Sequence, residues 1–139
     1  MSATERTLVL VKPDGVARGL VGQIIARYEA KGLRIEALEL RRADAKLAAE
    51  HYAEHIGRDY YPPLEAFITS GPLVAMVLEG ERAIEAVRVL NGATDSAVAA
   101  PGTIRGDFSL FKNRNLVHAS DTPEAAEREI ALWFPTPAL

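Results

Sequence analysis

Two stretches of the chain are apolar at nearly every position, which is typical of β-strands buried on both faces. Residues 7–11 read Thr-Leu-Val-Leu-Val, and residues 73–78 read Leu-Val-Ala-Met-Val-Leu. Turn-forming residues mark one end of each, because Lys-Pro-Asp-Gly at 12–15 follows the first run and Ser-Gly-Pro at 70–72 precedes the second. The sequence therefore predicts two buried strands.

Two further segments, residues 33–41 and 104–110, alternate apolar and polar residues. A strand shows this pattern when one face packs on the core and the other faces water. The expected inward positions are Leu33, Ile35, Ala37 and Leu40 in the first segment, and Ile104, Gly106, Phe108 and Leu110 in the second. Both segments are predicted as half-exposed strands, with Leu38 out of phase in the first.

Helical spacing of apolar residues predicts helices over residues 20–30, 44–55, 59–69, 81–90 and 122–134. Gly32 provides a stop for the first helix, and Asp44 is expected to cap the second. Pro123 suits the first turn of the last helix, and Trp133 is expected to dock that helix on the body. Residues 91–103 follow neither pattern and predict a long loop, which in a compact domain is usually functional or disordered.

The predicted order is strand, helix, strand, helical insert, strand, helix, strand, helix, which indicates an α+β protein. Because two strands have one wet face, the pattern favours an antiparallel or mixed four-stranded sheet with helices packed on it. The split βαβ arrangement (βαββαβ) of ferredoxin-like folds has this form. A parallel doubly wound sheet is the alternative, but it would hide every strand. A length of 139 residues suits one domain, expected to span residues 1–139.

The composition excludes several classes of function. The chain has no cysteine, so disulfides, zinc fingers and thiol catalysis are ruled out. Its 16 basic and 19 acidic residues give a net charge of −3, with no sign of a nucleic-acid footprint. No apolar run reaches the roughly 18 residues of a membrane span, and the N-terminus lacks a signal-peptide pattern. We therefore expect no membrane partner, no specific nucleic-acid partner and a cytoplasmic location.

The densest cluster of hydrogen-bonding side chains surrounds His118, one of three histidines, within residues 115–121. A histidine held in this way can act as a general base, a metal ligand or a nucleophile. The alternative is a helix-entry turn, in which Ser120, Asp121 or Thr122 caps the last helix and His118 is incidental.

Four other residues have both an ordinary and a functional interpretation. Arg88 and Arg105 bracket the long loop; the ordinary roles are to offset a helix dipole for Arg88 and to line a solvated strand face for Arg105. His51 and His55 have the i, i+4 spacing of a metal pair. Because the sequence shows no third ligand, we expect both histidines to be solvated helix residues.

Taken together, the motifs resemble the nucleoside diphosphate kinase family over nearly the whole chain. They are Thr7–Leu20 with its Lys-Pro-Asp-Gly turn, Thr69–Pro72, Pro101–Phe108 and, most specifically, Asn115–Asp121. The resemblance implies a ferredoxin-like core with an antiparallel sheet. It also implies transfer of the γ-phosphoryl group from a nucleoside triphosphate, typically ATP, to a nucleoside diphosphate through a phosphohistidine, with broad base and sugar specificity. The short segment after Trp133 resembles bacterial members.

The resemblance also implies a catalytic group. His118 is the nucleophile, and imidazole suits this role because it is substantially unprotonated near neutral pH. Glu129 and Ser120 orient it, and Tyr52 lies beside it. Lys12 lies close to the transferred phosphoryl group.

Nucleotide binding is implied for a second set of residues. The chain has no Gly-x-x-x-x-Gly-Lys loop, so phosphates must be bound by side chains. The matching phosphate ligands are Arg58, Arg88, Thr94 and Arg105, the ribose ligands are Lys12 and Asn115, and the residues flanking the base are Tyr60 and Lys112. Mg²⁺ is expected to arrive with the nucleotide. The family also implies a homo-oligomer, a hexamer or tetramer built from dimers.

The chain departs from the family pattern at four positions. Tyr60 replaces a usual Phe, Lys112 a small apolar residue, Ala119 a common Gly and Ser96 a Pro of the long loop. The first two put base affinity in question, and Ser96 concerns the loop and its subunit contacts. Two rival interpretations are a relative that only binds nucleotides and a ligand-sensing ferredoxin-like module. A phosphoenzyme would distinguish the kinase from both.

Overall fold

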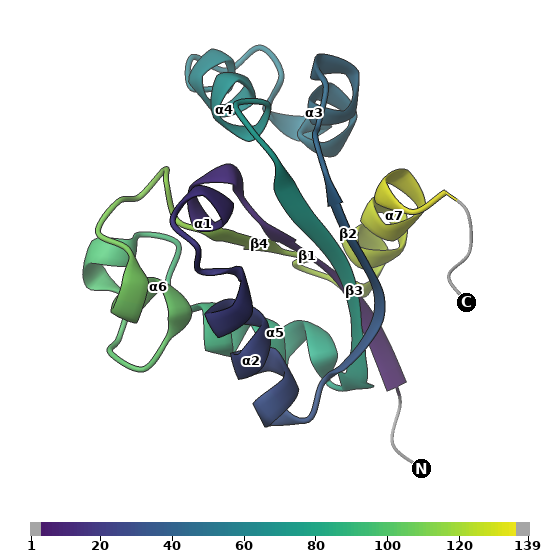
Figure 1. Cartoon of the computed structure of the whole chain (residues 1–139). Helices are drawn as coiled ribbons and strands as arrows, with labels where there is room; N and C mark the ends of the chain where they lie inside the picture. Colours follow the sequence, from purple (N-terminus) through teal and green to yellow (C-terminus); the bar gives the residue numbers. More distant parts are fainter. Residues whose placement is uncertain (1–3, 136–139) are drawn as a thin grey trace.

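The computed structural model describes residues 4–135, and a four-stranded sheet forms its centre (Figure 1). The strands are β1 (Thr4–Val11), β2 (Arg34–Arg41), β3 (Leu73–Glu81) and β4 (Val117–Ala119). They lie in the order β2-β3-β1-β4, and every neighbouring pair is antiparallel. The predicted α+β class and the antiparallel βαββαβ sheet are confirmed, and the parallel alternative is wrong.

Helices pack on both faces of this sheet (Figure 1). They are α1 (Pro13–Ala17), α2 (Val21–Lys31), α3 (Ala45–His51), α4 (Tyr61–Ile68), α5 (Ala83–Asn91), α6 (Ile104–Phe108) and α7 (Pro123–Trp133), with 3₁₀ turns η1 (Ala53–His55) and η2 (Ser96–Val98). The predicted helix over 44–55 is divided, because α3 ends at His51 and η1 follows. Within the described residues, no helix has the length and apolar character needed to cross a membrane.

Strand β1 divides the core in two, because its side chains alternate between the faces of the sheet. Val9 and Val11 pack in a cluster with residues of α2 and α5. Leu8 and Leu10 pack in a second cluster with residues of α3, α4 and α7. This two-sided burial confirms the interpretation of residues 7–11 and places the C-terminal end of β1 between two helical layers.

Strand β2 lies at an edge of the sheet and departs from the predicted pattern. The pairing register with β3 shifts between Ile35 and Ala37, which marks a β-bulge. The bulge explains why Leu38 falls out of phase in the sequence. Leu38 and Leu40 remain 52% and 66% exposed. The prediction that Leu40 faces the core is therefore wrong, because apolar alternation alone does not show how far the helices extend over a face.

The segment 104–110 does not form the predicted strand, because its residues Ile104–Phe108 form helix α6. Thr103 caps α6, since its hydroxyl oxygen accepts a hydrogen bond from the Gly106 backbone N–H at 3.0 Å. The chain then leaves regular structure, and Leu110 is exposed. The fourth strand is β4, which contains His118 itself. A short alternating run is compatible with a strand and with a short helix. Here the Thr103 cap favours the helix.

Several local predictions at helix ends are confirmed. The Asp44 carboxylate accepts from the Leu47 N–H at 2.8 Å and caps α3. Gly32 ends α2 with φ +105°, a left-handed conformation that favours glycine. Thr122 caps α7, Pro123 lies in its first turn, and Trp133 is buried against the body. Of the short segment after Trp133, residues 136–139 lie outside the described residues.

Candidate active site

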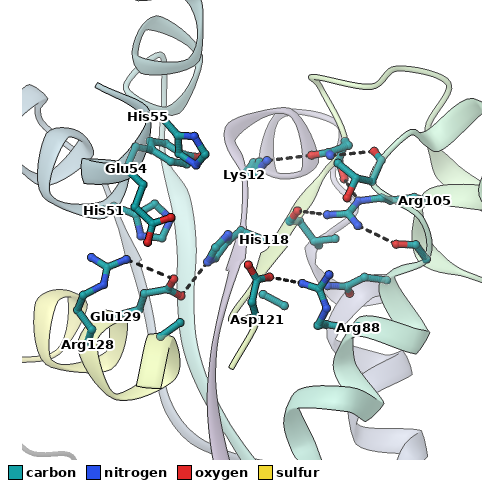
Figure 2. Close-up of a pocket in the computed structure, with 18 residues that line it drawn as sticks. Lys12, His51, Glu54, His55, Arg88, Arg105, His118, Asp121, Arg128 and Glu129 are labelled. Atoms are coloured by element: carbon teal, nitrogen blue, oxygen red, sulfur yellow. Dashed lines mark hydrogen bonds and ion pairs between the residues drawn. The ribbon is translucent and has the colours of Figure 1, made fainter. Parts of the chain in front are cut away.

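A cleft of about 350 Å³ opens where β1 and β4 meet the ends of α3, α5 and α7. Figure 2 shows Arg88 and Arg105 on one side of His118, and His51 at the end of α3 together with Arg128 on the other. The predicted site residues among its lining are Lys12, Tyr52, Arg88, Thr94, Arg105, Asn115, His118 and Glu129. Ser120 is buried behind them. The fold thus brings together nine of the twelve residues singled out from the sequence.

Two backbone contacts bring the end of β1 to the start of β4. The Lys12 N–H donates to the Leu116 carbonyl at 2.7 Å. The Leu116 N–H in turn donates to the Asp14 carboxylate at 3.1 Å. The sequence predicted a turn at residues 12–15, and these residues form the start of α1, with Pro13 in its first position. The contacts place Lys12 beside residues 115–118, which lie about a hundred positions away in the chain.

His118 is held at one ring nitrogen by a buried carboxylate. Its Nε2 lies 2.9 Å from Glu129 Oε1, and the Ser120 hydroxyl donates to the same oxygen at 2.9 Å. Burial alone would raise the pKa of Glu129, but the hydrogen bonds from His118 and Ser120 and the charge of Arg128 hold it below its usual value. An ionised carboxylate can only accept, so His118 Nε2 carries a proton, and in the neutral form of the ring the lone pair is on Nδ1.

Lys12 is a buried cation beside this histidine (Figure 2). Its Nζ donates to Asn115 Oδ1 at 2.8 Å, and the Asn115 amide donates to the Thr94 carbonyl at 3.1 Å. Burial and then the positive charge of Arg105 lower the pKa of Lys12 to about 8. The chain from Lys12 through Asn115 to Thr94 anchors the long loop to the sheet.

Arg105 differs from its predicted surroundings, because it lies buried on α6 rather than on a solvated strand face. Its Nε, Nη1 and Nη2 donate to the carbonyls of Asn115, Gly92 and Val117 at 3.1, 2.8 and 2.7 Å. Gly92 has φ +87°, and a Cβ there would lie 2.5 Å from the Thr103 hydroxyl. Arg105 therefore ties both ends of the loop to β4, and its remaining N–H donors are left for a ligand.

Arg88 lies on α5, on the same side of His118 as Arg105 (Figure 2), and forms an ion pair with Asp121. Both side chains are largely exposed, so the pair is expected to stabilise the fold little. A phosphate entering the cleft could replace the Asp121 carboxylate as the partner of Arg88.

Three predicted nucleotide ligands are not part of the cleft lining. Arg58, Tyr60 and Lys112 are exposed. Tyr60 is nevertheless tied to the cleft rim, because its hydroxyl lies 2.7 Å from Nδ1 of His55, which is a lining residue. The prediction that His55 is a helix residue in solvent is therefore incomplete, since it lies half-buried in η1.

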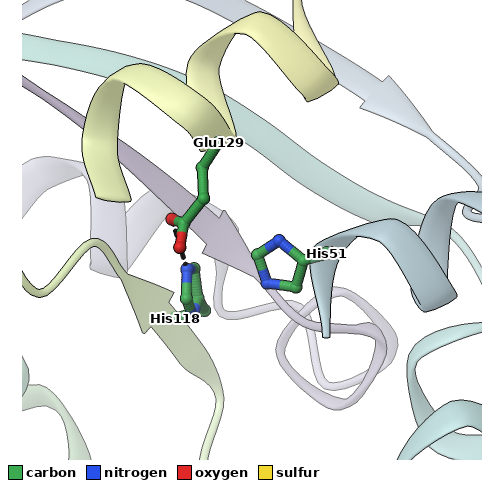
Figure 3. A group of neighbouring side chains, drawn as sticks. All are labelled: His51, His118 and Glu129. Carbon is green, nitrogen blue, oxygen red and sulfur yellow. Dashed lines mark hydrogen bonds and ion pairs between the residues drawn. The ribbon is translucent and has the colours of Figure 1, made fainter. Parts of the chain in front are cut away.

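His51 has a place in the structure that its spacing from His55 did not predict. It was expected in solvent, yet it is 4% exposed and its ring centroid lies 4.5 Å from that of His118. Figure 3 shows it beside His118 and Glu129. The neighbouring Tyr52 ring lies 4.6 Å from His51, and burial followed by the charge of Glu129 raises the pKa of Tyr52. In the sequence, His51 belongs to an Ala-rich helix, and this composition does not predict which face of the helix is buried.

Comparison with known proteins agrees with this geometry. The profile of the nucleoside diphosphate kinase family matches residues 5–139. The nucleoside diphosphate kinase of Cutibacterium acnes is 70% identical over 97% of this chain and 98% of its own length. That of Mycobacterium tuberculosis is 62% identical over 95% and 98%. A halophilic nucleoside diphosphate kinase from Halobacterium salinarum, solved in complex with CDP, superposes with a TM-score of 0.95 at 51% identity, covering 99% of this chain and 92% of that one.

The chain therefore belongs to the nucleoside diphosphate kinase family, whose bacterial members it matches over nearly its full length. It is an enzyme of the kinase class, a transferase that acts on nucleotides.

Proposed function

We propose that this kinase transfers the γ-phosphoryl group of a nucleoside triphosphate, typically ATP, to a nucleoside diphosphate in two steps through a phosphohistidine on His118. The observation that carries the proposal is the pairing of His118 Nε2 with the buried Glu129 carboxylate. This pairing leaves the Nδ1 lone pair free for attack. A histidine that only bound nucleotide would not need a fixed tautomer.

The first step forms one bond and breaks one. The Nδ1 lone pair of His118 attacks the γ-phosphorus, and the bond to the oxygen of the leaving diphosphate breaks, with its electron pair moving to that oxygen. Lys12 and the free donors of Arg105 lie in the same cleft, where they meet the charge on the transferred group. The ring becomes cationic when phosphorylated, and the Glu129 carboxylate at Nε2 stabilises it. The second step is the reverse with another diphosphate, which gives ping-pong kinetics.

The proposed binding roles follow the positions of the side chains. The inner cleft would take the phosphates through Arg88, Thr94 and Arg105, and the ribose through Lys12 and Asn115. The base would lie at the mouth, near Tyr60. Arg58 and Lys112 lie outside the cleft lining, and we propose that they contact the part of the bound nucleotide that extends from the cleft. Because aromatic stacking is sequence-tolerant, we propose broad acceptance of bases and sugars.

Mg²⁺ fits this cleft as a partner of the nucleotide rather than as a resident ion. Three carboxylates line the cleft: that of Glu129 is engaged by His118 and Ser120, that of Asp121 pairs with Arg88, and that of Glu54 is the third. The cleft therefore offers no spare cage of oxygens, whereas phosphate oxygens and water are the ligands that Mg²⁺ prefers. Bound to the phosphates, Mg²⁺ would neutralise part of their charge.

We further propose one domain over residues 1–139, a cytoplasmic location with access to the nucleotide pool, and a homo-oligomer, either hexamer or tetramer built from dimers. The exposed Leu38 and Leu40 on edge strand β2 support the oligomer. Light scattering at micromolar concentration is expected to give a mass well above the 15.1 kDa of one chain. A monomer under these conditions would contradict the oligomer and leave the chemistry untouched.

The proposed reaction has a direct test. We expect the protein mixed with Mg²⁺ and ATP labelled at the γ-phosphate to form an acid-labile, base-stable phosphoprotein without acceptor. A chase with several nucleoside diphosphates should then remove the label, with kcat/KM differing by less than about a thousandfold among bases. Larger differences would mean polar readout of the base. Nucleotide binding without label would favour the binding-only relative.

The pH dependence should report on Lys12. We expect kcat/KM for ATP, which reacts with the unphosphorylated enzyme, to fall as the pH rises through about 8, because burial lowers the pKa of Lys12 to that value and the neutral amine loses its attraction for phosphate. Below this pKa the amine is charged and the site is complete. The measurement is a profile over about pH 6–10. The control is Lys12→Arg, in which the charge persists and the fall should disappear. A flat wild-type profile would contradict this role.

A further inference from the structure

His51 has a donor that the structure leaves unused. The indole N–H of Trp133 donates to His51 Nδ1 at 3.0 Å, and both side chains are buried. His51 Nε2 is buried without a hydrogen-bond partner among the described residues. A buried polar atom without a partner is costly and usually has a reason.

The hydrogen bond from Trp133 fixes the tautomer of His51. An indole N–H can only donate, so His51 Nδ1 must present a lone pair. Burial, followed by the charge of His118, lowers the pKa of His51 well below its ordinary value, so the ring is neutral near pH 7. A neutral imidazole with a bare Nδ1 carries its proton on Nε2. The unused atom is therefore an N–H group.

The His51 ring lies against the nucleophile. Its centroid is 4.5 Å from that of His118, and the two planes cross at 76°. Figure 3 shows the rings side by side, with Glu129 on the Nε2 edge of His118. Edge-to-face contacts of this kind are favourable because the positive edge of one ring meets the electron-rich face of the other, and an N–H on the edge strengthens them.

We propose that His51 is a positioning residue for the phosphoryl-transfer reaction: held by Trp133, it packs edge-to-face on His118 and, together with Glu129, keeps Nδ1 of His118 aimed into the cleft. This inference rests on the proposed function. Glu129 alone holds one atom of the ring and leaves it free to turn about that hydrogen bond. A second contact on the ring removes this freedom, and small errors in the position of a nucleophile are costly in rate.

The same residues do not form a metal site. Ligand atoms of His51, His118 and Glu129 lie within 4.8 Å of one another, a spacing that a metal ion could bridge. A metal needs a ring nitrogen with a free lone pair. In His51 the Nδ1 lone pair accepts from Trp133 and Nε2 carries the proton, so His51 has none to offer. Zinc binding would require breaking the contact with Trp133.

The tautomer can be measured without any substrate. In protein labelled with ¹⁵N-histidine, we expect the His51 ring to show a protonated Nε2 and an unprotonated Nδ1, with the signal assigned by its loss in His51→Gln. Trp133→Phe removes the donor and should give a mixture of tautomers. A proton on Nδ1 in the wild-type protein would overturn the proposal. This result is independent of phosphoryl transfer, so it separates the inference from the proposed function.

The rate effect is tested with paired variants. We expect His51→Leu to lower kcat by about 10- to 100-fold while the Kd for nucleotide changes by less than about threefold. His51→Gln, which can accept from Trp133 and donate toward His118, should recover most of the rate. A folded His51→Leu with unchanged kcat would overturn the proposal, as would an effect confined to KM. If His51→Leu fails to fold, Trp133→Phe takes its place, with an expected fall of about 3- to 10-fold.

Zinc supplies the last arm of the test. Zn²⁺ alone, titrated into the wild-type protein and into His51→Gln, is expected to bind both equally or not at all. Tight binding that is lost in His51→Gln would show that the contact with Trp133 does not hold the His51 ring, and it would overturn the proposed positioning role.

Discussion

Replacing His118 with alanine is expected to lower kcat by at least about 10⁴-fold, because no other side chain in the cleft offers an unprotonated nucleophile with the same support. Lys12 is charged below about pH 8, and the proton of the buried Tyr52 is held tightly, since burial raises its pKa. His51 has its lone pair occupied by Trp133. The measurement is the steady-state rate together with the formation of labelled phosphoprotein.

Binding and stability provide the controls for this variant. His118→Ala should bind nucleotide within a few-fold of the wild-type protein, because the cationic side chains of the cleft remain. It should also keep its melting temperature to within a few degrees, since the β4 backbone pairing with β1 does not depend on the ring. Turnover above about 1% of the wild-type rate would place the nucleophile elsewhere, and the two-step mechanism would fail.

The fold was predictable from the sequence wherever the pattern was long or capped. The run of residues 7–11 is buried on both faces, as predicted, and the Asp44 and Thr122 caps begin their helices. The failure at 104–110 came from a segment of only seven residues, in which helical and extended patterns overlap. The exposure of Leu40 came from tertiary packing, because it depends on where α2 and α5 end rather than on β2 itself.

The site was predictable where residues match a motif and hidden where they act through contacts. The Glu129 carboxylate contacts both His118 and Ser120, as the family resemblance implies, and each of the two hydrogen bonds is 2.9 Å long. His51 carried no such motif, and its burial depends on Trp133, which lies 82 positions away. Long-range contacts of this kind determine the tautomer and the orientation of a histidine ring. Neither property can be predicted from the spacing of neighbouring residues in the sequence.

Arg105 illustrates the same limit for a residue that the resemblance did identify. The resemblance implies a phosphate ligand, and the ordinary alternative is a residue on a solvated strand face, whereas the structure places Arg105 on α6 with donors committed to three carbonyls. The guanidinium stays charged in proteins even where burial lowers its pKa, as it does here. Arg105 thus holds the loop, and under the proposed function it would also present charge to the phosphates, so a substitution should reveal both effects.

We expect Arg105→Ala to lower the free energy of unfolding by about 2–4 kcal/mol, because the carbonyls of Gly92, Asn115 and Val117 lose a charged donor. It should also lower kcat by about 100- to 1,000-fold, more than it weakens binding, since the charge of the transferred group is greatest in the transition state. Urea unfolding and steady-state kinetics on the folded protein measure the two effects separately.

Arg105→Lys separates the two tasks within one site. An ammonium keeps the charge but lacks the planar fork that reaches three carbonyls, so it should recover part of kcat and little of the stability. Arg34→Ala is the matched control, because Arg34 is exposed on β2 and, within residues 4–135, forms an ion pair with Glu79 alone, so both measurements should stay near wild type. If Arg105→Ala loses stability while kcat of the folded protein is unchanged, the residue only holds the loop. Its unused N–H donors would then have no part in phosphoryl transfer.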